Sequence, residues 1–64
     1  MAEHPSTVAL GDDDRATRDA AVEILTAARD GLRAMTPEHD ALWLLLDSTA
    51  DYLSITVHTL GDLA

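Results

Sequence analysis

The sequence predicts an all-α fold: an antiparallel two-helix hairpin, which we expect either to assemble as a four-helix bundle or to dock on a larger partner. Three observations lead to this prediction. Apolar and small residues recur at helical spacing on both sides of Thr36-Pro37. The small residues of the first stretch complement the leucines of the second in size. The chain has only 64 residues and no cysteine, so it needs stabilisation from outside its own small core.

Residues 1–11 are expected to form a flexible N-terminal arm, and residues 12–64 the helical hairpin. The arm shows no sustained period, contains Pro5 and ends in Gly11, and both residue types interrupt regular structure. Its first residues include no basic region, and no apolar run follows them. We therefore expect no secretory signal and a cytoplasmic location.

The first helix is expected over residues 13–35. Three aspartates at 12–14 favour a helix start, because carboxylates cap free N–H groups and interact well with the positive end of the helix dipole. Beyond them, the apolar residues lie on one side of a helical wheel and most charged residues on the other. The sequence therefore predicts an amphipathic helix.

The turn is expected at residue 36 and the second helix over residues 37–60. Thr36 is a good N-cap, Pro37 suits the first helical position, and Glu38 adds an acid to the first turn. Gly61 is a plausible C-terminal stop. A connection this short makes the two helices antiparallel neighbours.

Contact between the two helices is predicted along a 4,3 repeat in each. The predicted packing residues are Ala21, Ile24, Ala28 and Gly31 from the first helix, and Leu42, Leu46, Leu53 and Leu60 from the second. Glycine inside a helix costs about 1 kcal/mol relative to alanine, so Gly31 on this seam suggests a close approach of the second backbone. Large knobs would then enter shallow holes.

The second helix has more apolar circumference than one neighbour can cover. Its apolar arc is about 160° wide and includes Leu45 and Tyr52 as well as the predicted seam. Trp43, Ala50 and Val57 are spaced by seven residues and form a second stripe. We expect these three to form the interface with another copy of the chain or with a protein partner that offers an apolar groove.

Charge restricts the partners. Twelve acidic residues against four arginines give a net charge of −8, and no lysine or arginine follows residue 36. Acidic surfaces repel polyanions, so nucleic acid is not an expected partner. An anionic membrane surface is disfavoured for the same reason. A basic patch on a protein fits this charge better.

No pattern in the sequence indicates an enzyme, and we expect no cofactor. Asp47, Asp51 and His58 lie on one helical face and could hold a metal, especially if two copies met. That face is predicted to lie opposite the apolar arc, however, so a solvated polar surface is favoured and no residue is assigned as a metal ligand. A two-helix chain also has little ability to enclose a substrate.

The leading functional hypothesis is a non-catalytic helical protein–protein interaction module, either a self-assembling bundle or a small accessory or regulatory subunit of a larger complex. A second hypothesis is an acidic, antitoxin-like or anti-regulator inhibitor that occupies a basic site on its target. A metal-binding bundle that uses carboxylates and histidine is the third.

Overall fold

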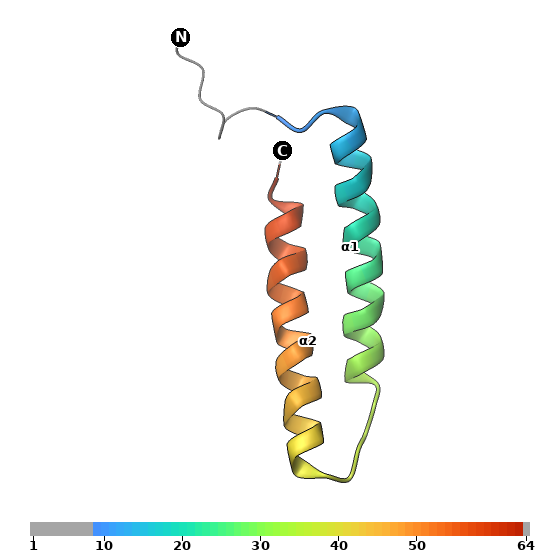
Figure 1. Cartoon of the computed structure of the whole chain (residues 1–64), viewed down its shortest axis with the longest axis vertical. Helices are drawn as coiled ribbons and strands as arrows, with labels where there is room; N and C mark the ends of the chain where they lie inside the picture. Colours follow the sequence, from blue (N-terminus) through green and yellow to red (C-terminus); the bar gives the residue numbers. More distant parts are fainter. Residues whose placement is uncertain (1–8, 64) are drawn as a thin grey trace.

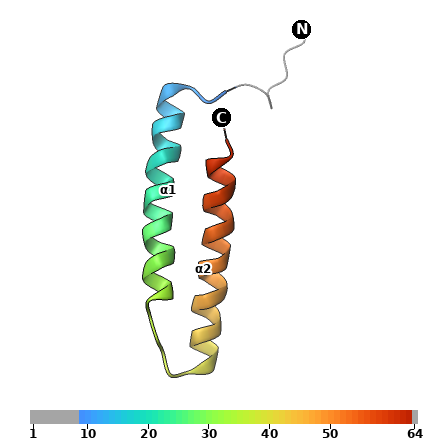
Figure 2. The ribbon, with the colours of Figure 1, turned by 180° about the vertical axis from the view of Figure 1, so that it is seen from behind.

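The chain folds as an antiparallel hairpin of two helices in a computed structural model that describes residues 9–63. Helix α1 spans Asp12–Arg33 and helix α2 spans Asp40–Gly61. The helices lie side by side in both views, and α1 begins at the end where α2 finishes (Figures 1 and 2). The predicted all-α hairpin is confirmed. Residues 1–8 of the predicted N-terminal arm lie outside the described residues.

Helix α1 begins at the aspartate run, as the sequence predicts. Gly11, in an extended conformation, is the cap residue, and its carbonyl accepts a hydrogen bond from the Arg15 N–H at 2.9 Å. All three aspartates occupy the first turn. Their carboxylates therefore act on the helix dipole rather than as the cap itself. The Arg15 guanidinium adds a hydrogen bond of 3.2 Å to the Leu10 carbonyl.

The connection between the helices is longer than predicted. Helix α1 ends at Arg33 and α2 begins only at Asp40, so Thr36 and Pro37 lie in the connection. The cap of α2 is His39, whose Nδ1 accepts a hydrogen bond from the Ala41 N–H at 3.1 Å. The imidazole of His39 therefore caps α2 in place of the Thr36 hydroxyl that the sequence predicts. Neither helix is long and apolar enough to cross a lipid bilayer.

Replacing His39 with alanine is expected to lower the stability of α2 by about 1 kcal/mol, because the Ala41 N–H would lose its acceptor. Helical circular dichroism during urea unfolding measures this change. The matched variant His39→Asp restores an acceptor and should keep the wild-type midpoint or exceed it. If both variants unfolded at the same urea concentration, the ring would not act as a cap.

The two helices meet along a narrow seam that contains one completely buried residue. Among residues 9–63, only Ala50 has no exposed surface. Its neighbours along the seam are half-buried: Arg18, Val22, Leu25, Arg29 and Leu32 from α1, and Leu46, Leu53, Val57 and Leu60 from α2. Leu46, Leu53 and Leu60, which the sequence predicts for helix packing, are half-buried, and Leu42 has 46% of its surface exposed.

The predicted seam of α1 is rotated relative to the observed one. Ala21 is half-buried, but Ile24 is 67% exposed and Ala28 and Gly31 are exposed as well. An added Cβ at Gly31 would meet nothing within 4 Å, so the expected close approach of α2 to Gly31 is wrong for the single chain. The observed seam uses Arg18 and Arg29, whose aliphatic stems cover apolar surface while their charged ends reach outward.

The second stripe predicted on α2, which consists of Trp43, Ala50 and Val57, does not form one exposed surface. Ala50 is completely buried and Val57 is half-buried inside the hairpin, so neither forms a free surface for a partner. Trp43 remains 50% exposed at the edge of the seam. The physical reason is that α1 packs between the two stripes that the sequence separates, and contacts residues of both.

Candidate interaction surface

Three arginine side chains of α1 donate hydrogen bonds to α2 and to the residues just after it. The Arg33 guanidinium donates a 2.9 Å hydrogen bond to the Asp51 carboxylate, and that of Arg29 donates one of 3.2 Å to the Ser54 hydroxyl. Near the open end, Arg18 donates to the carbonyls of Leu60 and Leu63. The polar stripe of α2 therefore lies beside the seam. As predicted, the carboxylates and histidine of this stripe are exposed to solvent, whereas Ser54 is half-buried beside Arg29.

These polar contacts fix geometry more than they add stability. Arg33 and Asp51 both keep about half or more of their side-chain surface in solvent. An exposed ion pair of this kind contributes only ~0–1 kcal/mol. Arg18 and Arg29 also bond to the adjacent aspartates Asp19 and Asp30 within α1. The arginines thus set the register of the two helices and leave the stability to apolar contacts.

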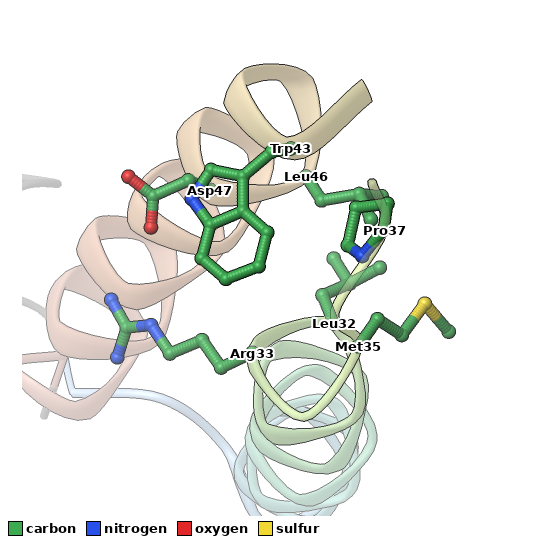
Figure 3. Close-up of a pocket in the computed structure, with 7 residues that line it drawn as sticks. All are labelled: Leu32, Arg33, Met35, Pro37, Trp43, Leu46 and Asp47. Carbon is green, nitrogen blue, oxygen red and sulfur yellow. The ribbon is translucent and has the colours of Figure 1, made fainter. Parts of the chain in front are cut away.

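A shallow cleft lies where the seam meets the connection. Trp43, Leu46 and Asp47 line it from α2, and Leu32 and Arg33 from α1, with Met35 and Pro37 from the connection. Figure 3 shows Arg33 and Asp47 on the same side of this cleft, beside the Trp43 ring, and Met35 on the other side. The cleft therefore joins a charged side of the hairpin to an apolar one.

The carboxylate and histidine residues considered for a metal do not form a compact cluster. Within the part of the chain that the structure describes, no group of three or more histidine, cysteine, aspartate or glutamate side chains could hold a metal ion. Asp51 is engaged by Arg33, and the exposed His58 lies 3.9 Å from Asp62, one turn further along α2. Asp47, Asp51 and His58 of one chain thus offer no metal site.

The Arg33–Asp51 contact shows how the remaining surfaces are arranged. Arg33 directly follows the seam residue Leu32, and Asp51 directly follows Ala50, so each lies about 100° around its helix from the seam. Their hydrogen bond places these two surfaces on the same side of the hairpin. Residues that directly precede the seam positions are rotated the opposite way in both helices, and they share the other side.

We call that other side the uncharged face. Its residues are Thr17, Ala21, Ile24, Ala28 and Gly31 of α1, and Leu42, Leu45, Thr49, Tyr52, Thr56 and Thr59 of α2. From Thr17 onward this face has no ionisable side chain apart from the weakly acidic Tyr52 hydroxyl; Asp13, in the first turn of α1, lies on the same side of the helix beyond its end. In a chain with a net charge of −8, so long an uncharged strip means that the acidic groups are gathered elsewhere.

The uncharged face carries large apolar side chains in solvent. Ile24, Leu45 and Tyr52 are each about two-thirds exposed, and Leu42 is nearly half exposed. Exposed single leucines are common, but several large apolar side chains exposed on one side of a small hairpin are typical of a contact surface. The sequence pattern placed Leu45 and Tyr52 in the wide apolar arc of α2. It did not select them as partner contacts, because it assigned Ala50 and Val57 to that role.

Two further exposed apolar residues lie away from this face. Leu44 and Ile55 are 63% and 64% exposed, and both project from the side of α2 that is turned away from α1. Ser48 and Asp51 separate them along this outer side. Leu44 and Leu45 are therefore two leucines of nearly equal exposure, but Leu45 lies on the uncharged face and Leu44 points away from α1.

Comparison of the chain with protein-family models, with curated proteins and with solved structures found no match.

Proposed function

We propose that the chain is a non-catalytic helical protein–protein interaction module, working as a self-assembling bundle or as a small accessory or regulatory subunit. The uncharged face, with Ile24, Leu42, Leu45 and Tyr52 in solvent, supports this proposal most directly. Association removes such side chains from water, and each contributes in proportion to the apolar area that becomes covered. The acidic groups elsewhere keep the unassociated surface hydrated.

The small size of the internal core supports the same proposal. A hairpin whose described residues include a single completely buried side chain gains little hydrophobic stabilisation from its own folding. Two isolated helices of 22 residues are themselves of marginal stability in water. We therefore propose that folding and binding are coupled, so that the hairpin reaches its full helicity only when a protein surface covers the uncharged face.

Coupled folding predicts that the isolated single chain is unstable. At ~1 µM, we expect weak helical circular dichroism and a broad, non-cooperative thermal transition, because half-buried contacts alone do not offset the conformational entropy. Trifluoroethanol, which favours helices without requiring association, serves as the control for intrinsic helical propensity. A monomer of full helicity that unfolds cooperatively at this concentration would exclude the proposal. Sedimentation at the same concentration establishes that the species is monomeric.

A further inference from the structure

We propose that the partner of the uncharged face is a second copy of this chain, and that two hairpins stack face to face as a four-helix bundle. This inference rests on the proposed function and specifies its partner. Three features of the single hairpin support a second copy as the partner: the extent of the uncharged face, the distribution of side-chain size across it, and the position of the charges relative to it.

The uncharged face is large enough for a stable dimer. Helices of 22 residues are about 33 Å long, and two of them packed side by side are about 20 Å wide. The face thus offers roughly 650 Å² per copy, or ~1,300 Å² for two copies. That value lies within the range of about 1,200–2,000 Å² typical of specific protein interfaces.

Side-chain size makes the face complementary to itself. Its α1 edge is lined by Ala21, Ala28 and Gly31, with Ile24 as the only large side chain among the residues of this edge. Its α2 edge carries Leu42, Leu45 and Tyr52. A twofold axis parallel to the helices places α2 of each hairpin over α1 of the other, so that large side chains meet small ones at both edges. The free space around Gly31 in the single chain is then available to the second copy.

Charge is compatible with pairing even though both copies are acidic. The polar stripe of α2, with Asp40, Asp47 and Asp51, lies on the Arg33 side of the hairpin and away from the uncharged face. In the stacked pair, these stripes are on the outer surfaces and more than a helix diameter apart. Charges separated by more than about 8 Å are largely screened at physiological ionic strength. A basic partner, by contrast, would find its complementary charge on the other side.

Leu45→Glu and Leu44→Glu form a matched pair of test variants. Both replace a leucine of α2 that is almost two-thirds exposed in the single chain, so the hairpin itself should tolerate them equally. Only Leu45 lies on the uncharged face. In the dimer, Leu45→Glu places an unpaired carboxylate from each copy in the interface, which should raise the dissociation constant by at least ~100-fold. Leu44→Glu should change it by less than about threefold.

Analytical ultracentrifugation of the full chain and both variants from ~1 to 100 µM, with circular dichroism on the same samples, tests the inference. A wild-type dimer that Leu45→Glu dissociates and Leu44→Glu preserves supports it. Equal effects of the two variants, or a wild-type assembly larger than a dimer, would overturn it. A wild-type monomer that stays weakly helical at 100 µM would also overturn it, yet would leave the proposed interaction module intact with a different partner. A fully helical, cooperatively folded monomer would overturn both.

Discussion

Replacing Ala50 with leucine is expected to destabilise the hairpin by about 1–3 kcal/mol, because the larger side chain has no space between the helices. Ala50 has no exposed surface, so its side chain is completely enclosed between the two helices. A side chain with three more carbons there must push α1 and α2 apart, and the half-buried contacts of Leu46 and Leu53 on either side would loosen with it. For a domain of this size, such a loss is a large part of the total stability.

Ala27→Leu is the matched control for Ala50→Leu. Ala27 is an exposed residue on the outer side of α1, so the same added atoms should meet only solvent there. Urea unfolding followed by circular dichroism, at a protein concentration equal for both variants and the wild type, measures the difference. If Ala50→Leu unfolded at the same urea concentration as Ala27→Leu, the close contact between the helices at Ala50 would be refuted.

At ~100 µM, where the wild-type chain is expected to be associated and helical, replacing Val57 with aspartate is expected to cost at least ~2 kcal/mol and to abolish most of the helical signal. Val57 is half-buried on the seam, one helical turn from Leu53 and next to Leu60. A carboxylate at this position would lose part of its hydration. The nearby Arg29 guanidinium already donates its hydrogen bond to the Ser54 hydroxyl. The effect is on the hairpin itself, in contrast to Leu45→Glu, which is expected to act on association.

Ile55→Asp provides the comparison for Val57→Asp, since Ile55 is 64% exposed on the side of α2 that is turned away from α1, two residues before Val57. It adds the same charge to the C-terminal part of α2, and therefore the same unfavourable interaction with the helix dipole. The difference between the two thermal midpoints isolates the cost of placing the charge on the seam. Equal midpoints would mean that Val57 does not contact α1.

The sequence by itself determined the elements of this protein. Helical periodicity on both sides of a proline, an aspartate run at one end and Gly61 at the other predicted two helices of the right length and order. These features are local, since a helix start or a repeating apolar side depends on residues only a few positions apart. The excess of apolar surface on the second helix is also a property of the sequence, and the structure leaves Leu45 and Tyr52 in solvent.

The connection was predicted less accurately because two local signals compete there. Thr36-Pro37-Glu38 has the composition of a helix start, but the residue before a proline is disfavoured in helical conformation. In the structure α2 begins three residues later than predicted, where the His39 ring can reach the Ala41 N–H. Composition alone does not rank a histidine cap above a threonine cap, because the better cap depends on where the chain must turn to meet α1.

Only the tertiary structure decided which side of each helix faces the other. The 4,3 repeat of small and apolar residues predicts the α1 contact at Ala21, Ile24, Ala28 and Gly31, whereas the observed seam includes Arg18 and Arg29. An arginine can pack its stem on an apolar neighbour and still place its guanidinium on Ser54 or a helix-end carbonyl. A rotation of about 100° therefore separates the predicted side from the observed one. This rotation of α1 turns Ile24 and Gly31 toward solvent, while Ala50 of α2 becomes buried. The side that a helix turns inward depends on its partner helix, and local residue spacing does not determine it.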